Sequence, residues 1–227
     1  MYQYPMSIDF MKPDNKSDKP ELVLAPEAPE TPGISEATPC AMCHLPTQWG
    51  EFEMRVISEN DTESIALSMG AVDDGKPVLM RVHSECLTGD VFSSKRCDCE
   101  AQLHAALAEI AREGRGVLIY LRQEGRGIGL YNKILAYKLQ EKGADTVEAN
   151  RLLGLGDDLR TYDSAARLLN ILGVKSVRLL TNNPKKIKAM EDLGIRVQER
   201  VSLHVGYNPH NIEYMKTKQR RLGHMKD

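Results

Sequence analysis

The chain has 227 residues, 41% of them hydrophobic and 27% charged, and a formal net charge of −2. This length suits one large domain, or one domain with an appendage. No run of about 18 uncharged apolar residues is present, which argues against a membrane protein, and the near-zero net charge argues against a nucleic-acid partner. The first residues lack the basic and apolar regions of a secretory signal, so we expect a soluble, cytoplasmic protein.

Prolines are concentrated in the N-terminal part of the chain. Eight of the eleven lie in residues 1–47, in a stretch with no hydrophobic period. This pattern predicts a disordered or loosely attached arm over residues 1–44, followed by one catalytic domain over residues 45–227. Beyond residue 47 the chain holds 27 basic and 25 acidic residues. Such a body attracts a phosphorylated small molecule if its cations converge.

Strand patterns precede an alternation of helices and strands. Strands are predicted over residues 51–58, 64–70 and 76–84, with a hairpin turn at Asp73-Asp74-Gly75 between the last two. The elements predicted after residue 100 are a helix over 101–114, a strand over 116–121, helices over 128–142 and 163–172, a strand over 176–181 and a helix over 184–194. This order predicts an α/β (α+β) fold: one mixed-sheet domain with flanking helices and a strand-rich N-terminal half. We expect its active site in loops at the strand ends.

Cys86, Cys97 and Cys99 lie close together in the sequence, within a chain of only five cysteines. In a cytosolic protein such crowding favours metal binding or catalysis over disulfides. Catalytic zinc sites use three protein ligands and structural sites use four, so three thiols favour an open, catalytic zinc. Two alternatives stay open: a stabilising four-cysteine site that includes Cys40 and Cys43, and buried free thiols.

Two further motifs have the character of anion sites, and a third is by composition a charged loop. Arg122 and Arg126 accompany glycines 125, 127 and 129 between a strand and a helix, where backbone N–H groups can meet a phosphate. Two lysines begin the helix after "TNNP", and Asp158 stands two residues before Arg160 in a charged loop. The alternatives are an ordinary strand-to-helix turn and solvated surface lysines. A dinucleotide loop is disfavoured because the spacing is G-x-G-x-G.

The motifs RVHSECLTGD, RCDC, RQEGRGIGL, DTVEAN, DLRTY and LLTNNPKK occur in this order. Through them the chain resembles the GTP cyclohydrolase II family over roughly residues 45–225. The resemblance implies a homodimer that catalyses the first step of riboflavin biosynthesis. In that reaction GTP is hydrolysed with release of formate and pyrophosphate, which leaves 2,5-diamino-6-(5-phosphoribosylamino)pyrimidin-4(3H)-one. Many relatives also carry a dihydroxybutanone phosphate synthase, for which the arm here is too short, so a single activity is expected.

The resemblance also implies roles for individual residues. Cys86, Cys97 and Cys99 match the zinc ligands, and Mg²⁺ is expected on the triphosphate. The GTP-binding positions are Arg81, Val82, His83, Ser84, Glu85, Gln102, Glu124, Gly125, Arg126, Thr146, Thr181 and Lys186.

Three more positions match catalytic roles in the family. Arg160 matches a nucleophile toward the α-phosphorus, and Asp158 matches its proton acceptor. Guanidinium is protonated at ordinary pH, so Arg160 is alternatively a charge clamp on the transition state. Tyr137 matches a tyrosine near the reacting ring, and its presence favours full deformylation over a product that retains the formyl group.

Overall fold

The computed structural model describes residues 39–156, 158–221 and 223–225. The chain divides into two units, Met1–Ala37 and Thr38–Asp227. Most of the predicted arm therefore lies outside the described residues. The first strand, β1 (Cys40–Thr47), begins before the predicted boundary at residue 45 and pairs along its whole length with β2 (Gly50–Glu59). Cys40 and Cys43 consequently belong to the sheet and not to the arm.

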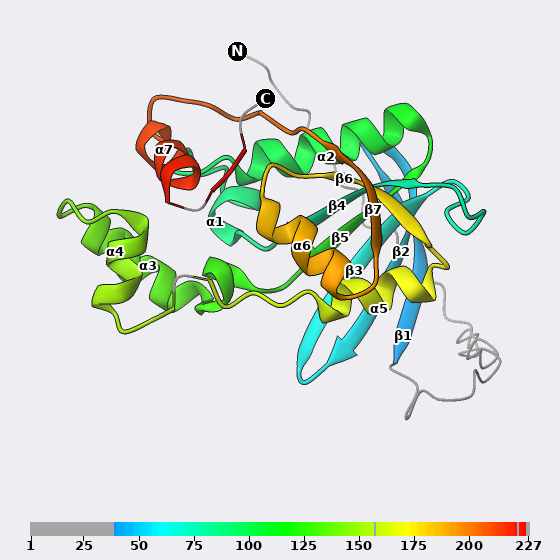
Figure 1. The fold of residues 1–227 in the computed structure, drawn as a ribbon, viewed down its shortest axis with the longest axis horizontal. Helices are drawn as coiled ribbons and strands as arrows, with labels where there is room; N and C mark the ends of the chain where they lie inside the picture. Colours follow the sequence, from blue (N-terminus) through cyan, green and yellow to red (C-terminus); the bar gives the residue numbers. More distant parts are fainter. Residues whose placement is uncertain (1–38, 157, 222, 226–227) are drawn as a thin grey trace, which may run out of the picture. The chain divides into compact units, whose positions relative to one another are not determined.

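One mixed sheet of seven strands forms the centre of the described unit (Figure 1). The strand order is β1-β2-β3-β5-β4-β6-β7, in which β1, β2, β3 and β5 run antiparallel to their neighbours and β5, β4, β6 and β7 run parallel. The remaining strands are β3 (Thr62–Met69), β4 (Val78–Ser84), β5 (Gly116–Leu121), β6 (Ser176–Leu180) and β7 (Arg196–Val201). The predicted α/β class with a strand-rich N-terminal half is confirmed.

The hairpin predicted between the strands at residues 64–70 and 76–84, which correspond to β3 and β4, is wrong. β3 and β4 do not pair, because β5 lies between them, antiparallel to β3 and parallel to β4. The physical reason is that β5 is apolar on both faces, with five of its six residues buried. Such a strand belongs in the middle of a sheet that is covered on both sides. Asp74 still begins a bend over residues 74–76, and its carboxylate accepts hydrogen bonds from the Lys76 N–H at 3.0 Å and from Arg115 at 2.5 Å.

Helices cover both faces of the sheet and create two hydrophobic clusters. α2 (Cys99–Glu113) buries Ala106, Leu107 and Ile110 against one face, and it ends at Gly114 in the left-handed conformation with φ 66°. α5 (Asp163–Ile171) and α6 (Pro184–Asp192) pack on the other face. Neighbours along β4 and β5 alternate between the two clusters, as the two-residue period of a strand requires.

The remaining helices gather near the ends of the parallel strands. They are α1 (Leu87–Asp90), the 3-10 turn η1 (Glu124–Gly127), α3 (Gly129–Gln140), α4 (Thr146–Leu152) and α7 (Ile212–Arg220). Sequence reasoning missed the strands β1 and β7 and the helices α1, α4 and α7. A signal for α4 was present, since Asp145 and Glu148 form a capping box. β7 and α7 are rich in charge and lack a strong apolar period. None of the described helices combines the length and apolar character that crossing a bilayer requires.

Candidate active site

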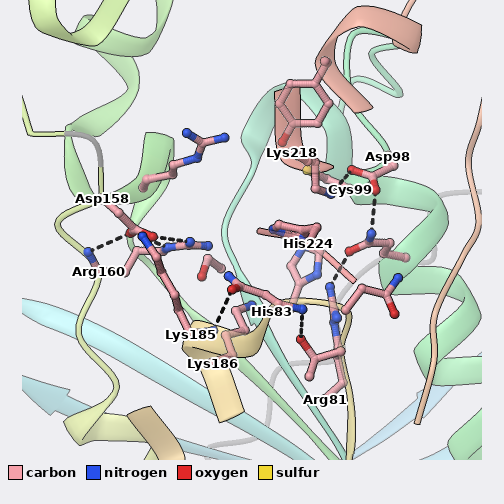
Figure 2. Close-up of a pocket in the computed structure, with 17 residues that line it drawn as sticks. Arg81, His83, Asp98, Cys99, Asp158, Arg160, Lys185, Lys186, Lys218 and His224 are labelled. Atoms are coloured by element: carbon pink, nitrogen blue, oxygen red, sulfur yellow. Dashed lines mark hydrogen bonds and ion pairs between the residues drawn. The ribbon is translucent and has the colours of Figure 1, made fainter. Parts of the chain in front are cut away.

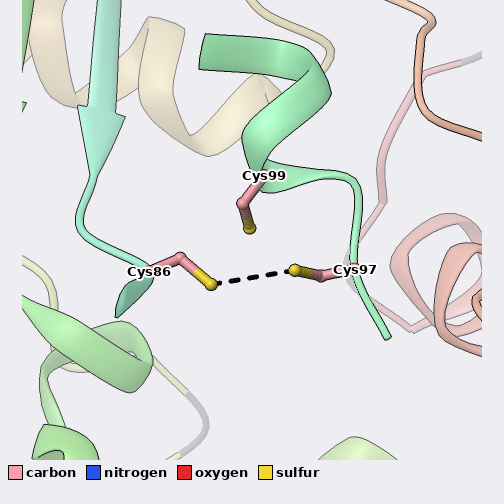
Figure 3. Close-up of side chains that lie close together, drawn as sticks. All are labelled: Cys86, Cys97 and Cys99. Carbon is pink, nitrogen blue, oxygen red and sulfur yellow. Dashed lines mark hydrogen bonds between the residues drawn. The ribbon is translucent and has the colours of Figure 1, made fainter. Parts of the chain in front are cut away.

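The three predicted thiols converge at the end of β4. Cys86 follows the strand, Cys97 lies in the loop before α2, and Cys99 is the first residue of α2 (Figure 3). Their sulfur atoms all lie within 4.8 Å of one another, and Cys86 Sγ is 3.7 Å from Cys97 Sγ. Within the described ranges, this is the one group of three or more His, Cys, Asp or Glu side chains close enough to share a metal ion. Cys40 and Cys43 are exposed on β1 and do not join it.

The surroundings of the thiols fit a metal centre. A Cβ added at Gly89 would lie 3.0 Å from Cys97 Sγ and 3.2 Å from Cys86 Sγ, so the backbone of α1 closes tightly over the sulfurs. The hydrogen bond from Cys97, followed by one from Cys99, holds the pKa of Cys86 far below its usual 9.0, whereas the same contact raises the pKa of Cys97 to about 11. Three cysteine sulfurs at this spacing form a donor set suited to a cation such as zinc.

Lys133 of α3 contacts the thiol cluster through hydrogen bonds. Its Nζ donates hydrogen bonds to Cys86 Sγ at 3.2 Å, Thr88 Oγ1 at 2.9 Å and Glu124 Oε1 at 2.8 Å. Burial lowers the pKa of Lys133, but the hydrogen bond to Glu124 and nearby negative charges outweigh burial and raise it. The carboxylate of Glu124 also accepts from the N–H of Gly125 at 2.7 Å. Glu124 is therefore engaged with protein groups at the edge of the thiols.

Beside the thiols lies a cavity of about 90 Å³, here called the cation cavity (Figure 2). Six basic side chains line it, opposed by the carboxylates of Asp98 and Asp158. The six are Arg81, Arg126, Arg160, Lys185, Lys186 and Lys218. Buried polar atoms in this wall have no hydrogen-bond partner among the described residues: Arg81 Nε, His83 Nδ1 and Arg126 Nη1. Unsatisfied donors at a convergence of cations are what a polyanion would satisfy.

Lys186 is a buried cation whose charged form is disfavoured by its surroundings. It is 6% exposed, and its Nζ donates to the carbonyl oxygen of Val82 at 2.8 Å. Burial holds its pKa well below the usual 10.5, and repulsion from Arg81 and Arg160 lowers it further. A bound anion would relieve both effects. The side chain of Val82 lies in the core at 1% exposure, so this residue offers the cavity only its backbone.

A second cavity, the thiol cavity, has a volume of about 130 Å³ and adjoins the first. Cys99, Arg126, Arg160 and Tyr214 line both, together with Ser84. The other predicted residues that line the thiol cavity are Cys86, Cys97, Glu85, Glu124, Gly125, Tyr137 and Thr146. Those that line the cation cavity are Arg81, His83, Gln102, Asp158, Thr181 and Lys186. Apart from Val82, every predicted site residue thus lines one of two adjoining cavities.

Sequence reasoning missed several residues of these walls. Asp98, Lys133, Tyr214, Lys218 and His224 line one or both cavities. Asp98 had a signal, because it stands between two predicted metal ligands. Tyr214 and Lys218 come from α7, more than 100 residues away in sequence from the thiols that they approach, and no local pattern marks them.

The mixed sheet and the two cavities define an α/β protein that sets three candidate metal ligands next to a cavity lined by six basic side chains. The family model described as GTP cyclohydrolase II matches residues 39–202. The chain belongs to the GTP cyclohydrolase II family.

Curated relatives agree. The chain is 59% identical over 187 residues to GTP cyclohydrolase-2 of Pseudomonas putida (strain W619), covering 82% of this chain and 91% of the relative. It is 55% identical over 186 residues to GTP cyclohydrolase-2 of Neisseria gonorrhoeae, covering 82% and 94%. A solved structure of RibBX, a two domain 3,4-dihydroxy-2-butanone 4-phosphate synthase from A. baumannii, aligns with a TM-score of 0.33 and 21% identity over 64% of this chain and 35% of its own, a similarity too weak to inform function.

Proposed function

We propose that this protein hydrolyses GTP, releasing formate and pyrophosphate and leaving 2,5-diamino-6-(5-phosphoribosylamino)pyrimidin-4(3H)-one, the first step of riboflavin biosynthesis. The observation that carries the proposal is that the thiol and cation cavities share a wall formed by Cys99, Arg126 and Arg160. A nucleotide with its base at the thiols and its phosphates among the cations would span both. The family membership and the names of the relatives support the same substrate.

Cys86, Cys97 and Cys99 are the residues that would hold one zinc ion per subunit. When bound, zinc supplies a Lewis acid that activates water near neutral pH. Mg²⁺ is the expected companion of the triphosphate, where it shields negative charge during attack at phosphorus. Tyr137 lines the thiol cavity, and burial raises its pKa, so its phenol stays protonated and can donate a hydrogen bond to the base or the leaving formyl group.

Arg81, Arg126 and Lys186 are suited to bind the phosphates. Arg81 and Arg126 each have a buried guanidinium nitrogen without a hydrogen-bond partner, and the charge of Lys186 is shielded from water by burial. For Arg160 we propose the role of a charge clamp. Its guanidinium makes two hydrogen bonds to Asp158, at 2.8 and 2.6 Å. Because this pairing favours the protonated guanidinium, the residue is poised to bind developing charge on phosphorus rather than to attack it. Asp158 would orient the clamp.

Two further proposals concern the setting of the enzyme. Leu130, Tyr131 and Ile134 of α3 are 38%, 77% and 48% exposed, and we propose that this apolar surface pairs with a second copy in a homodimer. We also place the protein in the cytoplasm, since three free thiols that bind metal require a reducing compartment.

The deciding experiment incubates purified protein with GTP, Mg²⁺ and zinc and measures formate and pyrophosphate together. We expect both products from the natural chain. Cys97→Ser should abolish formate release. Arg160→Ala should block pyrophosphate release while GTP binding stays detectable, and Arg160→Lys should retain part of it, because a lysine keeps the charge but loses the two-pronged geometry. Formate output unaffected by Cys97→Ser would refute the proposal, and mass analysis of the product reveals any retained formyl group.

A further inference from the structure

The chain that follows β7 packs directly on the turn that carries two of the thiols. This segment, here called the C-terminal clasp, comprises residues 206–220 and includes α7. It lies beyond the end of the family match at residue 202. Figure 2 shows Lys218 of the clasp beside Asp98 and Cys99, and Figure 1 shows α7 next to the start of α2. The clasp is thus the part of the chain that covers the Cys97-Asp98-Cys99 turn.

A buried ion pair joins the clasp to the middle of that turn. Lys218 Nζ donates to Asp98 Oδ1 at 3.0 Å and to Oδ2 at 2.8 Å. The two side chains are 11% and 1% exposed. Without Lys218 the Asp98 carboxylate would lose its ion pair in the interior and keep the hydrogen bond from the neutral amide of Gln102. A buried charge that loses its partner strongly disfavours the arrangement that buries it, so the turn would open to hydrate Asp98.

Two other contacts hold the turn on either side of Asp98. Asn211, which is fully buried, donates from Nδ2 to the carbonyl oxygen of Cys97 at 3.2 Å. Gly206 approaches so closely that a Cβ there would lie 2.8 Å from Ala101 Cβ and 3.2 Å from Asp98 Cβ. These contacts matter because Cys97 and Cys99 are separated by a single residue. Their sulfur atoms can point to one ion only while the backbone at Asp98 keeps its turn.

The same network extends into the cation cavity. Gln102 donates from Nε2 to Asp98 Oδ2 at 2.5 Å, and its Oε1 accepts from Arg81 Nη2 at 2.5 Å. Arg81 in turn donates from Nη1 to the carbonyl oxygen of Leu180 at 2.9 Å. Lys218 therefore anchors a chain of hydrogen bonds that runs from α7 through the thiol-bearing turn to a cation of the adjoining cavity.

We propose that the C-terminal clasp holds the Cys97-Asp98-Cys99 turn in its metal-binding geometry, with Lys218 and Asn211 as positioning residues. This inference rests on the proposed metal site. Residues that hold metal ligands through hydrogen bonds commonly change metal affinity by roughly 10- to 100-fold when replaced. Lys218 and Asn211 hydrogen-bond to the Asp98 carboxylate and to the backbone of Cys97, and they act on the metal site through these groups.

The test measures zinc affinity of the metal-free full chain by competition with a chromophoric chelator. Lys218→Met and Asn211→Asp should each weaken zinc binding by roughly tenfold or more, and Lys218→Arg should restore most of it. Both weakening substitutions leave the thiols in more negative surroundings, which by charge alone would tighten cation binding. Weaker binding therefore reports lost positioning. Lys216→Met, on the exposed side of α7 where Lys216 pairs with Glu213 at 2.6 Å, is the matched control and should bind zinc as the natural chain does.

Circular dichroism and the thermal midpoint of each variant establish that the chain is folded. Should Lys218→Met not fold, Asn211→Asp carries the test, because aspartate keeps the oxygen that accepts from the Asn208 N–H and removes the amide donor to the carbonyl oxygens of Cys97 and of Gly206 within the clasp. Natural affinity in folded Lys218→Met or in Asn211→Asp overturns the inference and leaves the proposed function intact. A natural chain that binds no zinc overturns both.

Discussion

Arg160 holds Asp158 in a two-pronged ion pair, with Nε 2.8 Å from Oδ1 and Nη2 2.6 Å from Oδ2. Burial acts against both charges, lowering the pKa of Arg160 and raising that of Asp158. The mutual hydrogen bonds outweigh burial, so the pKa of Arg160 lies above its usual 12.5 and that of Asp158 below its usual 3.8. The pair is therefore fully ionised across the physiological range.

Asp158→Asn should destabilise the fold in a pH-dependent way. The pKa of Asp158 is depressed, so its stabilisation is present above about 3.8 and is lost as pH falls through the lower folded value. At pH 7 we expect a loss on the order of 1–2 kcal/mol in the free energy of unfolding, since both side chains are partly exposed. Urea unfolding at pH 7 and pH 3 measures it. A difference from the natural chain that is equal at both pH values would contradict this account.

Lys186→Met should stabilise the protein while impairing substrate binding. The folded pKa of Lys186 is depressed, so below about 10.5 the unfolded chain binds this proton more tightly, and the natural protein loses stability as pH falls toward the folded value. Methionine removes that penalty, so we expect a higher thermal midpoint at pH 7 even though the carbonyl oxygen of Val82 loses its donor. Thermal unfolding and GTP titration measure the two effects. Lys188→Met, on the exposed side of α6, is the control and should change neither.

Gly89→Ala should lower zinc content. The added methyl group would meet Cys97 Sγ at 3.0 Å and Cys86 Sγ at 3.2 Å, forcing the sulfurs apart. Elemental analysis of protein purified with zinc should give clearly less than one ion per chain. Gly143→Ala is the control, because a Cβ there meets nothing within 4 Å although its φ of 104° is unfavourable for alanine. It should cost stability but keep its zinc, whereas equal zinc content in both variants would argue against a tight fit at Gly89.

Replacing both Cys40 and Cys43 by serine should leave zinc content and turnover unchanged. Both thiols are exposed on β1, and residues three apart on a strand face opposite sides, so the pair is poorly arranged to share one ion. Loss of zinc in this double variant would revive a four-cysteine site. The substitution is a cleaner probe than deleting residues 1–44, which would also remove the half of β1 that pairs with Glu53–Ile57.

Local patterns made the thiol site predictable, because its ligands lie within 14 residues and their chemistry is specific to soft metals. Strands β2 to β6 were equally accessible, because runs of apolar residues mark them in the sequence, whereas β1 and β7 lack so clear a signal. The pairing partner of β3 could not be predicted from local patterns. A short connection between two predicted strands suggests a hairpin, and only the apolar character of β5 on both faces indicates that β5 lies between β3 and β4. The clasp was hidden for another reason: Lys218 and Asp98 are 120 residues apart, and α7 shows mostly polar side chains.

The insertion of β5 between β3 and β4 also sets an order of events during synthesis. A nascent chain that ends before residue 116 holds an antiparallel meander and a separate strand with no common neighbour. Because β5 is the strand that joins the two parts, the strand carrying Arg81 can join the meander only after β5 has emerged from the ribosome. Cys86, Cys97 and Cys99 emerge before that step, so metal capture during translation would precede completion of the sheet that supports them.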